Sequence, residues 1–436
     1  MPTPLAVITG FGAISPLGLT SKEMWQALCA GSCGIEKIAA FDPVAFTCKI
    51  AGEVPEFKVQ KHIPKSFRKS VKLMCRDIKL SIVAANEAIV NSGLITKGID
   101  PENINVDPTR MSINLGAGFI SCDLEELAPS VAACVTEGKF DIKKWGKEGI
   151  EMITPLWLLK YLPNMLACHI GIIHDIQGPS NSITCAEAGS LLAICESAQI
   201  IARGDSDIAV TGGAEAKITP MLMTRQCLNK RATSENNDDP AGACRPFDAD
   251  AKGSVFGEAA GILVIENPKM AKDRDAKIYA EIIGFGQSTN INPAYEHADR
   301  DGKGIEIAIQ KALAQAGIKP EDIDLVIPHG TGIPQDDLAE ATAIQATLGC
   351  EVPVWPTKSM LSNTGAAGGT LDIIAAVSAM TDSIIPAAKN CDKKAEGCNL
   401  NIITQSQKAN IKYALCCSYT YGGQTAAIVL KKAGDN

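Results

Sequence analysis

Strand and helix patterns alternate along the whole chain, and this alternation predicts an α/β fold. Short apolar stretches typical of buried strands are interleaved with longer stretches whose apolar residues recur at helical spacing. An apolar strand followed by Gly-Phe-Gly occurs twice, at Gly10 and at Gly284. In a chain of 436 residues, this internal repeat predicts two related halves, 1–265 and 266–436.

In the first half, residues 5–9 are predicted to form a buried strand that leads into Gly10-Phe11-Gly12. Residues 190–203 are predicted to form a helix, because Leu191, Ile194 and Ile201 fall on one face. Two further strands are expected in this half, at 207–211, where Gly212-Gly213 ends the strand, and at 260–265.

The second half is predicted to begin with a strand at 278–283. Residues 304–316 are predicted to form a helix that stops at Gly317. A strand at 325–328 leads directly to His329, and strands at 413–417 and 425–430 are expected to form a hairpin around Gly422-Gly423.

Composition and charge narrow the class of protein. The chain is 46% hydrophobic and 21% charged, as ordinary globular proteins are, and its net charge of −8 argues against binding nucleic acid or an anionic membrane. We expect a cytoplasmic protein, because we find neither an export signal nor an apolar run of membrane-spanning length. Its 16 cysteines include no Cys-x-x-Cys pair, so we expect small buried side chains rather than disulfides or a metal site.

A series of motifs resembles the β-ketoacyl synthases of fatty-acid and polyketide assembly. The motifs occur in the family's order over essentially the whole chain, at 7–18, 178–180, 204–215, 245–261, 329–331, 357–360, 365–368 and 422–423. The resemblance implies the thiolase-like fold, a five-layered αβαβα sandwich of two similar halves. It also implies a dimer that forms through the first half.

Condensing members of this family use a cysteine at a strand-to-helix turn, followed by two histidines. A thiolate at a helix N-terminus is stabilised by the helix dipole and takes an acyl group from a carrier-protein thioester. The histidines then donate hydrogen bonds to the malonyl thioester carbonyl and stabilise the enolate that forms on loss of carbon dioxide.

Register places Glu187, and not Cys185, at the nucleophile position. In condensing members six residues separate the Gly-Pro-Ser motif from the cysteine, and here six residues separate Gly178-Pro179-Ser180 from Glu187. Aligning Cys185 instead would rotate the following helix by about 200°, at about 100° per residue. We therefore expect Cys185 on the strand behind the turn, packed in the core, although it stays the alternative nucleophile.

A carboxylate is a poor nucleophile toward a thioester, because the product would be a high-energy anhydride. Glu187 is expected to face the helix N-terminus and to form an ion pair with His329 if that histidine is protonated.

The remaining site residues follow from the resemblance. His329 matches the first family histidine, whereas Asn363 stands where the second is expected and can still donate a hydrogen bond. Lys358, Asp337 and Glu340 match the supporting polar network, and Thr331 belongs to the His-Gly-Thr motif; we expect Lys358 to pair with Glu340. The usual glycine-rich gate, a candidate oxyanion site, becomes Tyr421, Gly422 and Gly423.

Two surfaces are candidates for partners. Lys61, Lys65, Arg68, Lys69 and Lys72 are spaced for one helical face, which is either a solvated surface or a docking site for acidic acyl carrier protein through Lys65, Arg68 and Lys69. In the family, the region holding four apolar residues borders the acyl tunnel at the dimer interface: Phe119, Ile120, Leu124 and Leu127.

Three functions stay open. The first is a chain-length-factor-like subunit that lacks the cysteine, forms a heterodimer with an active ketosynthase and shapes the acyl tunnel. The second is an active 3-oxoacyl-[acyl carrier protein] synthase, a homodimer that uses Cys185, His329 and Asn363. The third is a decarboxylase of malonyl-carrier protein. None implies a bound metal or cofactor, because the carrier protein supplies phosphopantetheine.

Overall fold

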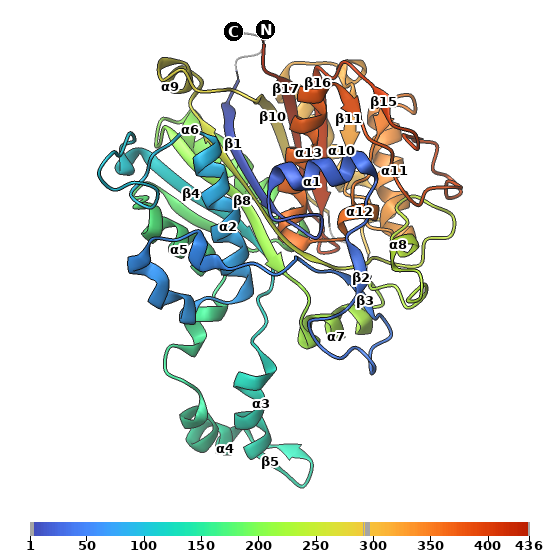
Figure 1. Ribbon diagram of the computed structural model, residues 1–436. Coiled ribbons are helices and arrows are strands. Elements are labelled where there is room, and N and C mark those ends of the chain that lie inside the picture. Colours follow the sequence, from blue (N-terminus) through green and yellow to red (C-terminus); the bar gives the residue numbers. More distant parts are fainter. Residues whose placement is uncertain (1–3, 291, 293–296, 435–436) are drawn as a thin grey trace.

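In the part of the chain that the structure describes, eleven strands form one sheet that is built from the same pattern twice (Figure 1). The computed structural model describes residues 4–290, 292 and 297–434. The sheet order is β14-β12-β11-β16-β17-β10-β1-β9-β8-β4-β7. The strands of the first half are β1 (Ala6–Ile14), β4 (Met111–Ala117), β7 (Ser180–Ile183), β8 (Ile208–Ala216) and β9 (Glu258–Glu266). Those of the second half are β10 (Ala280–Thr289), β11 (Leu325–Ile327), β12 (Pro353–Val354), β14 (Asn401–Ile402), β16 (Tyr413–Tyr419) and β17 (Gln424–Lys432).

The two halves repeat one pairing scheme. In the first, β1 and β9 pair antiparallel, as do β9 and β8, and then β8, β4 and β7 run parallel. In the second, β10, β17 and β16 pair antiparallel, and then β16, β11 and β12 run parallel. The topology therefore confirms two similar halves, joined where β1 pairs with β10. The boundary at residue 265 stays a prediction.

Helices cover both faces of the sheet halves and fill the space between them. Helices α2 (Arg76–Asn91) and α5 (Met165–His174) pack on the first half, and α10 (Lys303–Ala316) and α11 (Pro334–Leu348) lie on the opposite side of the molecule (Figure 1). Helices α6 (Gly189–Ala202) and α13 (Gly368–Asp382) are almost fully buried and contact strands of both halves. This is the thiolase-like α/β arrangement that the motifs predicted.

The repeated Gly-Phe-Gly has a packing explanation. A side chain at Gly10 or Gly12 would collide with the α2 backbone at Ala88 or Ala84, and one at Gly284 or Gly286 would collide with α10. Because a helix crosses the strand at backbone distance in each half, the same two glycines are needed twice.

Most predicted elements are confirmed within a few residues, including the helices at 190–203 and 304–316 and the closing hairpin. One prediction is wrong. Gly212-Gly213 does not end its strand, because β8 continues to Ala216. Both glycines are buried, and a side chain on either would meet backbone atoms of Gly261 or Ala366, so they serve close packing rather than a turn.

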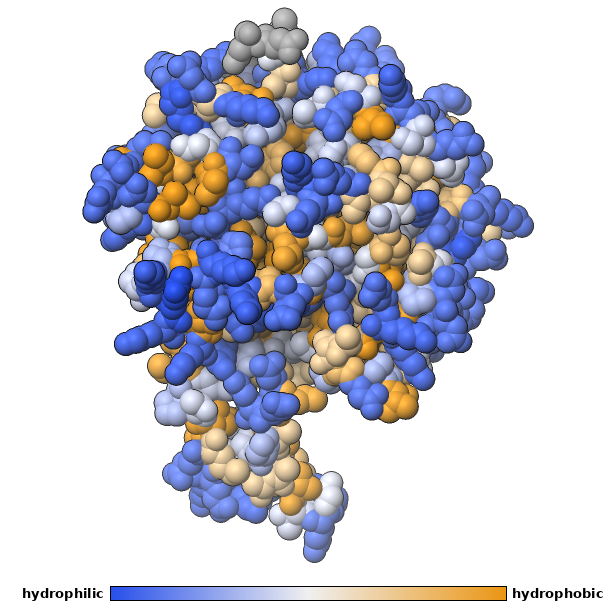
Figure 2. Space-filling view, viewed as in Figure 1, coloured by the Kyte–Doolittle hydropathy of each residue, from blue (hydrophilic) through white to orange (hydrophobic). Residues whose placement is uncertain are grey.

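Residues 118–164 form an arm that extends from the first half, seen at the bottom of Figure 1. It contains α3 (Leu124–Ala133), the β5–β6 hairpin (Val135–Thr136 and Lys139–Phe140), α4 (Ile142–Lys144) and short helices up to Tyr161. Many of its apolar side chains are exposed, and Figure 2 shows them as orange and tan patches on the arm.

Smaller elements complete the chain. They are α1 (Ser21–Ala30), α7 (Pro220–Leu228), α8 (Pro240–Ala243), α9 (Pro268–Asp273), α12 (Lys358–Leu361), β2 (Ile35–Lys37), β3 (Ile50–Gly52), β13 (Ile384–Ile385) and β15 (Gln407–Lys408). Among the described residues, no helix combines the length and apolar character needed to cross a membrane.

Candidate active site

Two buried turns, one at the start of each central helix, meet inside the molecule. The 3₁₀ turn η7 (Ala186–Ala188) leads into α6, and η9 (Gly365–Ala367) leads into α13. A helix start presents unpaired N–H groups and positive dipole potential, which favour a carboxylate. Glu187 lies in the first turn, and Glu215 of β8 accepts a hydrogen bond from the Ala366 N–H of the second (2.7 Å). Two helix starts therefore bring two carboxylates together.

Lys217 joins these two carboxylates. Its Nζ donates a hydrogen bond to Glu187 Oε1 (2.9 Å) and lies 3.7 Å from Glu215 Oε1. All three side chains are at most 3% exposed, so this charged group is shielded from water. A side chain at Gly365, whose φ is +58°, would collide with Glu215 Oε2, so the second turn needs a glycine for the carboxylate to fit.

The two carboxyl groups that share Lys217 have pKa values shifted in opposite directions. Burial alone would raise the pKa of Glu187, but the Lys217 ammonium and the Arg231 guanidinium outweigh burial and lower that pKa to about 2. Burial raises the pKa of Glu215, because the more distant lysine compensates it only in part and the Glu187 charge opposes its ionisation. The pKa of Lys217 is raised, because its two carboxylates outweigh burial. Glu187 and Lys217 therefore form a stable buried ion pair.

The elbow backbone distinguishes Glu187 from Cys185. Ala186 has a φ of +41°, an unusual value for a residue with a side chain, and this sharp turn directs Glu187 inward. The Ser418 hydroxyl donates to the Glu187 carbonyl (2.6 Å). Cys185 precedes the turn, beyond the end of β7, and is only half-buried rather than packed in the core. Burial raises the pKa of its thiol, which disfavours the reactive thiolate.

His329 lies at the end of β11 in a loop that two carboxylates shape. Glu340 accepts the N–H groups of His329 and Gly330, both at 2.7 Å, and Asp337 accepts the N–H of Thr331 at 2.7 Å and its hydroxyl at 3.1 Å. Burial raises the pKa of Glu340 to about 8 and that of Asp337 to about 6. These two residues and Thr331 therefore hold the backbone of the loop.

The expected ion pair between Glu187 and His329 is wrong. Burial and then the nearby Lys358 charge hold the pKa of His329 well below its usual value, so the ring is neutral near pH 7. The cation that pairs with Glu187 is Lys217. A neutral imidazole still has one N–H to donate, which keeps a hydrogen-bonding role open.

The expected pairing of Lys358 with Glu340 is also wrong. Lys358 Nζ donates to Asp372 Oδ2 (2.9 Å), and the Thr357 hydroxyl donates to the other carboxylate oxygen (2.6 Å). Each Glu340 oxygen instead accepts one backbone N–H group. Asp372 stands on α13, four residues after Gly368.

Three side chains of the predicted site carry buried polar atoms without a hydrogen-bond partner among the described residues: Glu187 Oε2, His329 Nδ1 and Asn363 Nδ2. Asn363 is held in place because its Oδ1 accepts the Gly365 N–H (3.1 Å), at the start of the second turn. Buried polar atoms usually have partners, so these three mark a polar site.

The predicted gate is a turn between β16 and β17, and an arginine contacts each side of its tyrosine. Arg225 donates to the Tyr421 hydroxyl (2.9 Å), and the Arg231 guanidinium lies 4.6 Å from the ring centroid. Arg231 also donates to Asp336 (2.9 Å), and both side chains are almost fully buried. Gly423, with a φ of +89°, allows the turn that precedes β17, next to Gly422.

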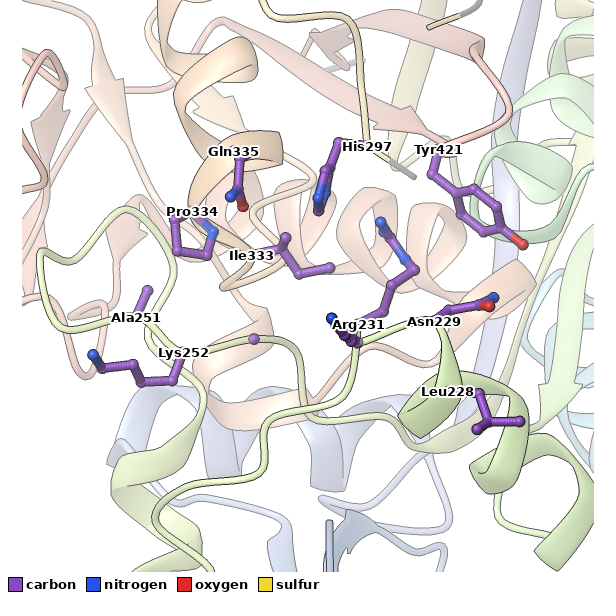
Figure 3. A pocket seen from close by; sticks show the side chains of 12 residues that line it. Leu228, Asn229, Arg231, Ala251, Lys252, His297, Ile333, Pro334, Gln335 and Tyr421 are labelled. Carbon is purple, nitrogen blue, oxygen red and sulfur yellow. The ribbon is translucent and has the colours of Figure 1, made fainter. Parts of the chain in front are cut away.

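A cavity of about 530 Å³ opens outside this gate (Figure 3). Its lining comes from the segments around Lys230, Lys252, His297 and Pro334, together with Arg231 and Tyr421. Among the described residues, those that line it do not include Glu187, His329 or Asn363. In Figure 3 the Arg231 side chain reaches up between His297 and Tyr421.

Several site residues were not predicted from the sequence: Lys217, Glu215, Arg231, Asp336 and Asp372. Glu215 ends the motif at 204–215 and Lys217 follows two residues later, but the sequence did not indicate that either would lie beside Glu187. Nothing in the sequence indicated that Arg231 and Asp336, 105 residues apart, would form a pair.

The candidate partner surfaces differ in form from the prediction. The basic residues lie on two short 3₁₀ helices, η1 (Val59–Lys61) and η2 (Lys65–Leu73), rather than on one α-helical face, and all five are exposed. Of the four apolar residues, which lie at the start of the arm, Phe119 and Leu124 are exposed, Leu127 is half-buried and Ile120 is buried.

The thiolase-like fold, with the elbow, the histidine loop and the gate in the order of the ketosynthase motifs, is that of a ketosynthase-type protein. The profile of the "Beta-ketoacyl synthase, N-terminal domain" matches residues 6–271, and that of the "Beta-ketoacyl synthase, C-terminal domain" matches residues 279–392. The chain therefore belongs to the β-ketoacyl synthase family of fatty-acid and polyketide biosynthesis.

Individual relatives agree with this assignment. The chain is 33% identical to the 3-oxoacyl-[acyl-carrier-protein] synthase 2 of Vibrio cholerae, over 98% of both chains. It is 34% identical to the protein of the same name from Staphylococcus aureus, again over 98% of both. Among solved structures, "The ishigamide ketosynthase/chain length factor" matches with a TM-score of 0.84 and 26% identity, over 98% of this chain and 99% of that one.

Proposed function

We propose that this chain is a non-condensing, chain-length-factor-like subunit that pairs with a cysteine-bearing ketosynthase. The observation that carries the proposal is the Glu187–Lys217 ion pair at the elbow. Where a condensing enzyme needs a thiolate, this chain has a carboxylate that a buried ammonium already neutralises. Such a carboxylate has little nucleophilic strength, and its anhydride with an acyl group would be unstable.

The apolar arm supports a partner subunit. Exposed apolar side chains gather on it, including Phe140, Ile142, Ile150 and Leu158, which are 47–65% exposed. The indole N–H groups of Trp145 and Trp157 are buried without a partner among the described residues. Exposed apolar patches of this kind mark protein interfaces, and an interface would also supply hydrogen-bond acceptors. The likeness to a ketosynthase/chain length factor structure points to a ketosynthase-fold partner.

The basic segment supports docking of a carrier protein. Lys65, Arg68 and Lys69 are exposed in a chain whose net charge is −8, so their positive charge is local. Carrier proteins are acidic, and such a patch would attract one. Relatives named for acyl-carrier-protein substrates are consistent with this partner.

The test is assembly and activity together. The chain is purified alone and after co-expression with a cysteine-bearing ketosynthase, and each sample is run by analytical ultracentrifugation. We expect a 1:1 heterodimer that elongates acyl chains only when both subunits are present. A stable homodimer that elongates acyl-carrier substrates unaided would refute the proposal. It would favour the alternative of an active 3-oxoacyl-[acyl carrier protein] synthase that uses Cys185.

A second function, decarboxylation of malonyl-carrier protein, is favoured by His329 and Asn363. Both side chains keep a buried nitrogen without a partner among the described residues, and donors of this kind stabilise an enolate. Release of labelled carbon dioxide that His329→Ala abolishes would support this function. No release above the protein-free rate would exclude it.

A further inference from the structure

Arg231 borders the outer cavity in Figure 3. This residue lines the cavity, yet its side chain is only 3% exposed. On the inner side of the Arg231–Asp336 pair, the Tyr419 hydroxyl donates to the Asp336 carbonyl (3.0 Å), and the Tyr419 ring lies 4.8 Å from the His329 ring, centroid to centroid. The guanidinium charge also lowers the pKa of Glu187 and of His329. Arg231 therefore lies between the open cavity and the closed elbow.

Arg231 is fixed on several sides. Asp336, which is 0% exposed, accepts its hydrogen bond and also accepts the Ala298 N–H at 2.8 Å, so the carboxylate cannot turn away freely. Tyr421 covers the guanidinium, and Arg225 holds the Tyr421 hydroxyl. The Arg231 backbone N–H donates a hydrogen bond to the Gln226 carbonyl, and the Arg231 carbonyl accepts one from the Ser254 N–H. Moving the side chain would separate a buried ion pair, which is costly when one charge is left uncompensated.

We propose that Arg231, clamped between Asp336 and Tyr421, is the barrier that keeps a thioester arm in the outer cavity from reaching the elbow. The inference rests on the proposed function and deepens it. Blocked access to the elbow would prevent acyl transfer on this chain even apart from the missing cysteine. A long neutral amide-and-thioester arm in the cavity would meet a buried, charged side chain, and Glu187 is not among the described residues that line the cavity. Exclusion by Arg231 is independent of the identity of residue 187.

The test introduces a thiol at the elbow and measures how fast iodoacetamide reaches it. All variants are made in a background protein that carries Cys185→Ser and Glu187→Cys. The elbow then contains a single thiol, at residue 187. To this background we add Arg231→Ala with Asp336→Asn, which removes both members of the ion pair and leaves no unpaired buried charge. Tyr421→Ala, in the same background, removes the cover and keeps the pair. Lys252→Ala is the matched control, because it removes an exposed cation from the same cavity.

Alkylation of the elbow peptide is followed by mass spectrometry in native buffer and in denaturant. We expect the Arg231→Ala, Asp336→Asn variant to be alkylated about tenfold faster than the background, because opening no longer requires breaking the pair. Tyr421→Ala should give a smaller increase and Lys252→Ala none. Removing Arg231 also raises the pKa of the introduced thiol, which slows its reaction, so a faster rate reports access. In denaturant all variants should react alike.

Two results would overturn the inference. One is a background thiol that reacts in native buffer as fast as in denaturant. The other is that neither Arg231→Ala with Asp336→Asn nor Tyr421→Ala is alkylated faster than the background. Tyr421→Ala leaves the buried ion pair intact. Assembly with a ketosynthase is measured separately, so failure of the barrier and failure of the proposed subunit role give different outcomes.

Discussion

Replacing Lys217 with methionine should destabilise the protein strongly. The substitution keeps the volume of the side chain but leaves the Glu187 carboxylate buried without its hydrogen-bonded cation. The pKa of Glu187 is about 2 in the folded chain and about 4.5 when unperturbed, and this difference is worth about 3 kcal/mol at neutral pH. Removing one partner of a buried pair typically costs about 3–5 kcal/mol. We therefore expect Lys217→Met to lower the free energy of unfolding by about 3 kcal/mol, near the lower limit because Arg231 still acts on Glu187.

A double-mutant cycle isolates the pair. Glu187→Gln alone should cost less, because Lys217 still has Glu215, 3.7 Å away, as a carboxylate partner. Lys217→Met with Glu187→Gln should recover much of the loss, since no unpaired charge stays buried at residue 187. Unfolding in urea is followed by tryptophan fluorescence at one fixed protein concentration, because assembly also changes stability. Lys269→Met, in an exposed ion pair with Asp273, is the control and should leave the free energy of unfolding almost unchanged.

The cycle also has a pH signature. Because the folded pKa of Glu187 is lowered, its contribution is present above about pH 4.5 and is lost as the pH falls toward about 2. The difference in stability between the unchanged chain and Glu187→Gln should shrink over that range. Equal costs for Lys217→Met and Lys269→Met, or strict additivity in the cycle, would refute the reasoning.

Three further outcomes are expected. Burial raises the pKa of Asp77 to about 7 from its usual 3.8, so the stability present below about pH 4 is lost as the pH rises to about 7. Asp77→Asn should therefore gain about 4 kcal/mol over the unchanged chain between pH 4 and pH 8 in urea unfolding, whereas exposed Asp238→Asn should show no such trend. Ile142→Asp on the arm should abolish the heterodimer in ultracentrifugation, whereas Val44→Asp, at a similarly exposed position outside the arm, should not. Loss of the heterodimer with both variants would indicate misfolding. Lys358→Met should cost about 3 kcal/mol, and Lys358→Met with Asp372→Asn should recover part of it; the same cost with and without the second change would contradict the pairing.

Much of the fold could be predicted because it depends on local patterns. The helix at 304–316 and its stop at Gly317 follow from apolar spacing and from a glycine that adopts a left-handed conformation. The Gly-Phe-Gly repeat predicted two related halves, and helix packing against β1 and β10 explains it. The end of β8 was misplaced because Gly212-Gly213 looks like a turn in sequence, whereas close packing against β9 and η9 is a tertiary property.

The site was predictable only where residues lie close in sequence. Counting from Gly178 indicated Glu187 for the elbow, and the structure has this residue in the turn that starts α6. Its partner was mistaken, because the choice between His329 and Lys217 depends on which side chain reaches the carboxylate after folding. The same holds for Lys358, which pairs with Asp372 and not with Glu340. Charge pairs across distant segments leave no local pattern.

The most direct test of a non-condensing elbow is the mass of the intact protein after exposure to substrate. The purified chain is incubated with acyl-loaded carrier protein, beside a condensing relative as the positive control. We expect the control to gain one acyl group and this chain to gain none, because Glu187 is held as a carboxylate by Lys217. An acyl adduct on this chain that Cys185→Ser removes would contradict the account.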